Sequence, residues 1–125
     1  SPAMNLMPGE IVGTGEKTTI KIAGEGTAVS HVATTEADMG LKVNIGVRPE
    51  DFTETEGDDF IYDGTVDFIE ALGEVTLLYF ELEHDRQVLA KLPGIHADVR
   101  GKTVKLTADP SKVHLFHEGK SLLYR

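Results

Sequence analysis

The segment 42–52 constrains the fold more than any other part of the chain. Its first half alternates, so Val43, Ile45 and Val47 fall on one face of an extended strand. Pro49 lacks a backbone N–H and restricts the residue before it, so a central strand cannot continue through it. The sequence therefore predicts a strand that ends in a tight helical turn at the proline.

Two carboxylates, Glu50 and Asp51, lie within three residues of Arg48. We interpret Arg48 as part of a surface ion pair or of a hydrogen bond that fixes the turn, since exposed pairs are common and contribute little stability. A ligand-binding arginine is the alternative.

Short extended runs separated by turn residues continue along the whole chain. Further strands are predicted at 9–13, 17–22, 27–32, 60–72, 75–82, 88–92, 102–107 and 113–116. Residues 35–40 could hold one helical turn, and Asp109 followed by Pro110 predicts a second, capped by the aspartate. A turn is expected at His84-Asp85 and a charged loop at 54–59. No stretch keeps a helical period for three turns, so the sequence predicts an all-β barrel or sandwich.

The run 75–82 carries apolar residues on both of its faces. Leu78, Phe80 and Leu82 would share one face, with Leu77 and Tyr79 on the other. A strand of this kind is typical of a central position, covered on both sides. The strands before residue 35 and those after residue 42 could still form separate sheets, and no exact internal repeat is evident.

Composition excludes several classes of function. The 125 residues suit one domain, and the net charge of −9 with scattered basic residues argues against a nucleic-acid partner. The absence of cysteine excludes disulfides and thiolate metal sites. No apolar run approaches the length of a membrane span, and no signal peptide is visible. Because the chain opens with Ser1-Pro2 rather than methionine, we expect it to be part of a longer protein.

No catalytic, cofactor-binding or metal-binding residue is predicted in this chain. Its five histidines lack ligand spacing, and His114 and His117 would point to opposite faces of a strand. The acidic run 54–59 lacks the ordered register of a calcium loop. The glycine pairs at 13–15 and 24–26 read as hairpin turns because no Gly-Lys-Ser/Thr and no helix follow them. None of the serines lies in a nucleophile elbow.

Four phrases, in this order, resemble one known family. They are Ser1-Pro2-Ala3-Met4-Asn5, Gly46-Val47-Arg48-Pro49-Glu50-Asp51, Glu70-Ala71-Leu72-Gly73-Glu74-Val75-Thr76-Leu77-Leu78-Tyr79 and Asp109-Pro110-Ser111-Lys112-Val113-His114-Leu115-Phe116. They are similar to the C-terminal regulatory domain of ATP-binding subunits in carbohydrate-importing ABC transporters of the maltose-importer type. The resemblance spans the whole chain.

The resemblance implies an all-β, OB-like barrel of the TOBE or MOP-like type, with an additional short β-sheet segment. Residues 1–125 would form a single regulatory domain, excised from a longer ABC ATPase subunit whose missing nucleotide-binding domain holds ATP and Mg. The implied partners are a second copy of the subunit, membrane permease subunits and, in some relatives, a regulatory protein. The implied location is peripheral, at the cytoplasmic face of the cell membrane. The imported substrate would be a sugar of the oligosaccharide or glycerol-phosphate class.

Within the family phrases, turn and core residues predominate. The resemblance implies that Arg48, Pro49 and Glu50 fix a turn, that Gly73 shapes a hairpin, and that Leu115 and Phe116 fill the barrel. Asp109, Pro110 and His114 belong to the same fold-determining set.

Two other functions remain open from the sequence. Related barrels in molybdate systems bind oxyanions between subunits, but usually open with Ser-Ala-Arg-Asn, and the arginine is missing here. An oligonucleotide-binding barrel would need a basic groove with stacking aromatics, which the acidic chain does not offer. For the isolated domain we predict weak self-association.

Overall fold

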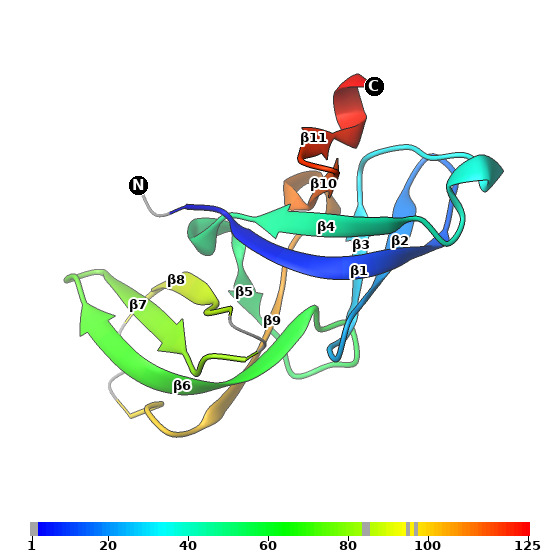
Figure 1. Ribbon diagram of the computed structural model, residues 1–125. Helices are drawn as coiled ribbons and strands as arrows, with labels where there is room; N and C mark the ends of the chain where they lie inside the picture. Colours follow the sequence, from blue (N-terminus) through cyan, green and yellow to red (C-terminus); the bar gives the residue numbers. More distant parts are fainter. Residues whose placement is uncertain (1–2, 84–85, 95, 97) are drawn as a thin grey trace.

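Two antiparallel sheets make up the molecule (Figure 1). The computed structural model describes residues 3–83, 86–94, 96 and 98–125. In the first sheet the strand order is β11-β10-β4-β1-β2-β3, and in the second it is β5-β9-β6-β7-β8. Helical structure in the described residues is confined to single 3-10 turns, so the predicted all-β class is confirmed.

The strands are β1 (Asn5–Gly13), β2 (Thr18–Ile22), β3 (Thr27–Ser30), β4 (Lys42–Val47), β5 (Thr53–Glu54), β6 (Tyr62–Ala71), β7 (Val75–Phe80), β8 (Leu89–Pro93), β9 (Thr103–Thr107), β10 (His114–His117) and β11 (Lys120–Ser121). The 3-10 turns are η1 (Glu36–Asp38), η2 (Pro49–Asp51), η3 (Pro110–Lys112) and η4 (Leu122–Tyr124). The predicted turns at residues 35–40, 49 and 109–112 are all present.

The first sheet is built around β1, the long strand that crosses Figure 1 in dark blue. It pairs with β2 on one side and β4 on the other, with Met7 opposite Ile45. Strands from before residue 35 and after residue 42 therefore share one sheet, and the alternative of separate sheets is wrong. Long-range pairing of β1 with β4 joins the two groups because both bury an apolar face in the same core.

Both sheets follow one plan, which makes the chain an internal repeat. Strands β1 to β4 are arranged in the order 4-1-2-3, and β6 to β9 repeat that order. The fifth strand of each half crosses over, so β5 pairs with β9 and β10 pairs with β4. Each half thus completes the sheet of the other. The repeat is absent from the sequence as an exact pattern and is visible only in the topology.

A single hydrophobic core contains side chains from both sheets. Leu78 and Phe80 of β7 are fully buried, and the Tyr62 ring meets the Phe80 ring edge-on at 5.2 Å. The predicted central position of β7 in its sheet is confirmed, since β7 lies between β6 and β8. The predicted cover on both faces is wrong, because Leu77 and Tyr79 on the outer face lie outside the hydrophobic core. Leu82 was expected on the same buried face, but it is 64% exposed because the strand ends at Phe80.

Other boundaries also differ from the predictions. The first strand begins at Asn5 and passes through Pro8, which has no N–H to donate to a neighbouring strand. The strand predicted over 27–32 ends at Ser30. The expected charged loop begins one residue late, because Glu54 belongs to β5. The predicted turn at His84-Asp85 lies outside the described residues.

Gly73 forms the β6–β7 hairpin with φ +88°, a conformation that favours glycine. Leu72 N donates to Val75 O across the hairpin at 2.9 Å.

In the part of the chain that the structure describes, no helix is long and apolar enough to cross a membrane.

Candidate functional site

The two proline turns of the family phrases occupy equivalent places in the two halves. Turn η2 follows β4 and packs against β8, whereas η3 follows β9 and packs against β3. Pro49 is buried at the first position of η2. In η3 the Asp109 carboxylate accepts from Ser111 N at 2.9 Å and from Ser111 Oγ at 2.7 Å. The bonds from Ser111 lower the pKa of Asp109, and the predicted cap is present.

Arg48 does not make the ion pair that its neighbours suggested. Among the described residues no carboxylate lies within 4 Å of its guanidinium, and the side chain is exposed. Arg48 keeps the extended backbone imposed by the following proline, while Glu50, also exposed, belongs to the turn itself. A backbone bond from Asp51 N to Arg48 O, 2.9 Å long, closes the turn instead.

Asn5 connects the start of β1 to the edge of the second sheet. Its side-chain Nδ2 donates to Leu89 O at 2.8 Å and to Val47 O at 3.1 Å, and Oδ1 accepts from Leu89 N at 2.9 Å. The amide thus pairs with β8 as another strand would. Because all of these bonds are structural, Asn5 has little capacity left for a ligand.

The edge strand of the first sheet, β3, is bonded in a similar way to the segment around η3. Ser30 Oγ donates to Val113 O at 2.6 Å, and His31 N donates to Pro110 O at 3.0 Å. The His31 ring stands edge-on to the His114 ring at 5.9 Å. Burial, followed by the nearby His31, lowers the pKa of His114. His114 is therefore a half-buried neighbour of the crossover, consistent with a place in the fold-determining set.

The remaining described histidines are bonded separately. His96 Nε2 lies 2.9 Å from Pro93 O, and His117 Nδ1 lies 2.9 Å from Lys42 O. Within the described ranges no three His, Asp or Glu side chains come close enough together to hold a metal ion.

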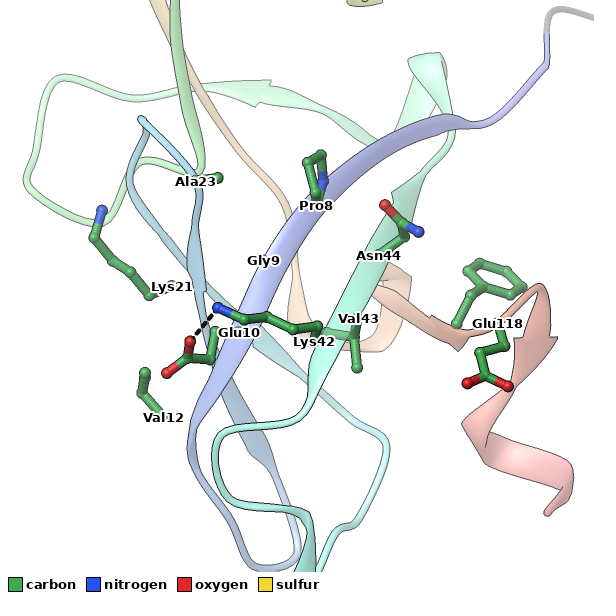
Figure 2. A pocket seen from close by; sticks show the side chains of 11 residues that line it. Pro8, Gly9, Glu10, Val12, Lys21, Ala23, Lys42, Val43, Asn44 and Glu118 are labelled. Carbon is green, nitrogen blue, oxygen red and sulfur yellow. Dashed lines mark hydrogen bonds and ion pairs between the residues drawn. The ribbon is translucent and has the colours of Figure 1, made fainter. Parts of the chain in front are cut away.

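A groove of about 450 Å³ runs over the outer face of the first sheet (Figure 2). Its walls mix apolar and charged side chains. They are Pro8, Gly9, Glu10, Val12, Lys21, Ala23, Lys42, Val43, Asn44, Phe116 and Glu118. Lys42 and Glu10 pair across β1 and β4 at 2.5 Å, so two of the groove's charges already neutralise each other.

Phe116 lines this groove and does not fill the barrel as the resemblance implied. Alternation along β10 places Leu115 in the core, fully buried, and leaves Phe116 half-buried on the outer face. There the ring lies over Gly46, beside Met4, in space that a Cβ at residue 46 would occupy.

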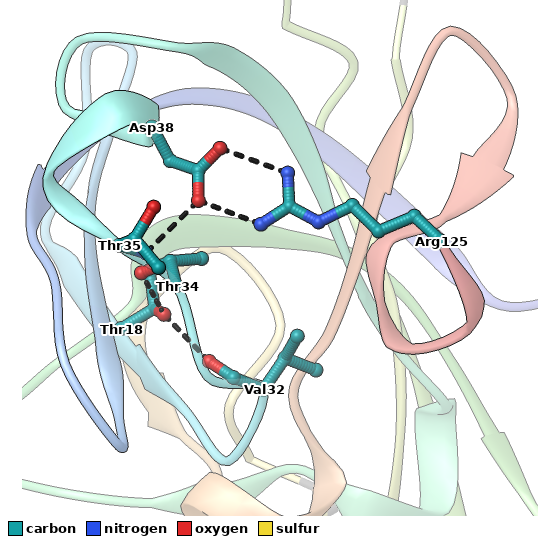
Figure 3. A network of polar contacts seen from close by, with 6 residues as sticks. All are labelled: Thr18, Val32, Thr34, Thr35, Asp38 and Arg125. Atoms are coloured by element: carbon teal, nitrogen blue, oxygen red, sulfur yellow. Dashed lines mark hydrogen bonds and ion pairs between the residues drawn. The ribbon is translucent and has the colours of Figure 1, made fainter.

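An ion pair at the end of the chain fixes the last turn to η1 (Figure 3). Arg125 Nη1 and Nη2 donate to the two Asp38 oxygens at 2.8 and 2.6 Å, a bidentate geometry that fixes orientation. Oδ2 also accepts from Thr35 N at 3.0 Å. The bonds from Arg125, followed by that from Thr35, lower the pKa of Asp38 to about 2.

Comparison with known protein families shows to which family this chain belongs. A family model described as the TOBE domain matches residues 45–116, more than half of the chain. The chain belongs to the TOBE domain family. A second model, described as the MalK OB fold domain, matches residues 1–52 of the same TOBE domain chain.

The curated relatives of this TOBE domain are ATP-binding proteins of sugar transport. Alpha-glucoside transport ATP-binding protein AglK of Rhizobium meliloti is 48% identical over 93% of the chain, which spans 32% of that relative. Maltose/maltodextrin import ATP-binding protein MalK of Vibrio vulnificus is 31% identical over 94% of the chain, again 32% of the relative. The TOBE domain chain therefore spans about a third of the length of the relatives it matches.

A solved structure shares the fold at much lower identity. The crystal structure of the cytoplasmic molybdate-binding protein ModG, with molybdate bound, gives a TM-score of 0.68 at 17% identity. The match covers 93% of the TOBE domain and 97% of that chain. It supports the all-β fold and nothing beyond the fold.

The structure adds contacts that the sequence predictions missed. Asn5 and Arg125 join segments 84 and 87 residues away along the chain. Thr18 Oγ1, buried, bonds to Val32 O at 2.5 Å and to Thr34 Oγ1 at 2.7 Å. Side-chain bonds over such separations leave no spacing pattern in a sequence, so only the bonds within the Asp109 turn could be predicted.

Proposed function

We propose that this chain is the regulatory and dimerisation domain of the ATP-binding subunit of a carbohydrate importer of the ABC class. The 48% identity to AglK over 117 residues carries the proposal. The same architecture, matched by the TOBE and MalK OB fold models along the chain, supports it.

The structure suits a rigid module. Each half closes the sheet of the other, and one core spans both. Local opening of either half would break pairing in both, so the two are expected to move as one body. A subunit that couples ATP hydrolysis to transport needs such a body to hold two copies in register while other domains move.

The parent protein would supply the rest of the transport cycle. In this proposal a nucleotide-binding domain elsewhere in the subunit binds ATP and Mg and hydrolyses the nucleotide. Membrane permease subunits are its partners, and the assembly lies at the cytoplasmic face of the membrane. A regulatory protein is a further proposed partner of this domain. The substrate would be a sugar of the oligosaccharide or glycerol-phosphate class.

A chimera tests the proposal. The matching third of Rhizobium meliloti AglK is replaced by this chain, and alpha-glucoside uptake is measured in cells that lack native AglK. We expect uptake within a few-fold of the native level, because chains that are 48% identical share their fold. The matched control carries Leu78→Asp in the same chimera and should lose uptake. A stable chimera that remains at the membrane yet gives no uptake would contradict the proposal.

Oxyanion binding is the alternative function, and its support is the ModG-like fold alone. Calorimetric titration of the chain with molybdate separates the two functions. We expect no stoichiometric heat, since Asn5 is already bonded to Leu89 and the arginine usual in such sites is missing. Tight stoichiometric binding would make the anion site the leading function.

A further inference from the structure

The outer face of strands β6, β7 and β8 carries an apolar surface that belongs to no core. Leu77 is only 8% exposed, yet it is not a member of the hydrophobic core, because β7 turns Leu78 and Phe80 inward and Leu77 and Tyr79 outward. A leucine on the outer side of a sheet is buried only by its neighbours on that face. We call this surface, with Phe68, Glu70, Leu77, Tyr79, Leu89 and Lys91, the β7 face.

Aromatic and aliphatic side chains are exposed on the β7 face. Phe68 is 54% exposed and lies against Tyr79, with ring centroids 5.5 Å apart. Leu72, at the tip of the same hairpin, is 49% exposed. Aromatic residues are enriched where proteins contact one another, so this composition indicates a contact surface.

The register fixes how the side chains of the β7 face are ordered. Phe68, Tyr79 and Leu89 form one row across the three strands. Glu70, Leu77 and Lys91 form the next, so an acid and a base flank a central leucine. Strands lie about 4.8 Å apart, which separates the Glu70 and Lys91 backbones by roughly 10 Å. Among the described residues neither charge has an ion pair within 4 Å.

This order is self-complementary under two-fold symmetry. An axis parallel to β7, between two facing copies, brings β6 of one copy over β8 of the other. Glu70 then faces the partner copy's Lys91, and Phe68 faces its Leu89, while Leu77 meets its own equivalent near the axis. Facing sheets pack about 10 Å apart at an angle near 30°, a distance and offset that long charged side chains can span.

We propose that the β7 face is the surface through which two copies of this chain associate, with a two-fold axis along β7. This inference rests on the proposed dimerisation function and specifies its contact surface. The groove on the first sheet is a poorer candidate, because its Glu10 and Lys42 are already paired with each other. About six side chains on each copy, against the 20–30 of a standard interface, indicate a weak, transient dimer for the domain alone.

Charge reversal tests the geometry. Dimer dissociation constants are measured by sedimentation equilibrium up to millimolar concentration for four proteins. These are the unmodified 125-residue chain, Glu70→Lys, Lys91→Glu and the double variant. We expect each single variant to weaken association at least tenfold, since like charges then face each other twice per dimer. The double variant restores opposite charges, so its dissociation constant should return to within about threefold of that of the unmodified chain. Glu16→Lys, an equal change of charge at an exposed site between β1 and β2, should have no such effect.

A second measurement locates the contact without relying on affinity. The chain has no cysteine, so Tyr79→Cys introduces a single thiol near the proposed axis. A short bis-maleimide should cross-link this variant into a covalent dimer, whereas a cysteine at Glu16 should give little product. Direct disulfide formation is not expected, because facing backbones about 10 Å apart exceed disulfide geometry.

The outcomes separate this inference from the proposed function. If the unmodified chain dimerises but the double variant does not regain its affinity, or Tyr79→Cys does not cross-link, the assignment of the contact to the β7 face is wrong while the dimerisation function stands. If the unmodified chain remains monomeric at millimolar concentration, the self-association proposed here is overturned. The AglK chimera would still decide the importer function independently.

Discussion

Asn5 has a structural role out of proportion to its size. Its amide makes two hydrogen bonds to Leu89 of β8, at 2.8 and 2.9 Å, and one to Val47 of β4 at 3.1 Å. Among the described residues no other side-chain hydrogen bond links β1 to β8. Replacing Asn5 by alanine leaves the Leu89 N–H and carbonyl without these partners in a partly buried place. We expect Asn5→Ala to lower the free energy of unfolding by about 2 kcal/mol, measured by urea denaturation.

Asn44 provides the matched control for this prediction. It is exposed on the outer face of β4, and no hydrogen bond of its side chain occurs within the described part of the chain. Asn44→Ala should change stability by no more than about 0.5 kcal/mol. Equal losses for the two alanine variants would show that the Asn5 bonds contribute nothing specific.

The ion pair of Asp38 with Arg125 predicts a pH dependence. The folded pKa of Asp38 is about 2, below its ordinary value of 3.8, so the carboxylate stabilises the fold above about pH 4. That contribution is lost as the pH falls towards 2. We expect Asp38→Asn to cost about 1 kcal/mol at pH 7, with the difference from the parent shrinking between pH 4 and 2.

Urea midpoints at pH 7, 4 and 2.5 measure this difference. Glu36→Gln, in the same 3-10 turn, is the matched control because it removes a charge that has no ion pair among the described residues. A pH-independent difference for Asp38→Asn would refute the assignment of its low pKa to Arg125.

Strand β7 contributes two side chains of the second sheet to the shared core. Leu78 and Phe80 are fully buried, whereas Leu82 lies beyond the strand and is largely exposed. We expect Leu78→Asp to abolish folding, because an unpaired carboxylate would enter an apolar core. Leu82→Asp should remain folded with nearly unchanged stability. Far-UV circular dichroism and the yield of soluble protein distinguish the two, and a folded Leu78→Asp variant would refute this placement of β7.

The exchange of fifth strands makes the two halves interdependent. Strand β10 completes the first sheet beside β4, and β5 extends the second beside β9. If the chain is divided in the exposed loop after Glu56, we expect residues 1–56 and 57–125 to be largely unfolded when separate. Mixed in equal amounts, they should recover the β-sheet signal and form a 1:1 complex.

Circular dichroism and analytical ultracentrifugation test this prediction. A folded 1–56 fragment would mean that the first half buries enough apolar surface without β10, which the shared core argues against. Fragments that stay unfolded together would indicate that the covalent link between the halves is needed for assembly.

Local signals in the sequence were sufficient for most of the elements. Alternation placed β2, β4 and β9 closely, and Pro49 and Asp109 with Pro110 marked their turns correctly. Pro8 hid the start of β1, because a proline usually argues against a central strand and only the pairing with Asn44 shows that it is tolerated here. The prediction that Leu82 is buried was wrong for the opposite reason. The alternation of apolar residues continues past Phe80, where the pairing of β7 ends.

At the scale of the whole molecule, the sequence by itself determined the all-β class and, through the resemblance of its four phrases, the family. These depend on short-range patterns that each segment carries within itself. Only the tertiary structure decided the internal repeat, the exchanged strands, the bonds of Asn5 and Asp38, and the order of charges across the β7 face. Each of these joins residues far apart in the chain, and such pairs are selected by which surfaces can be buried together, a property that no single segment contains.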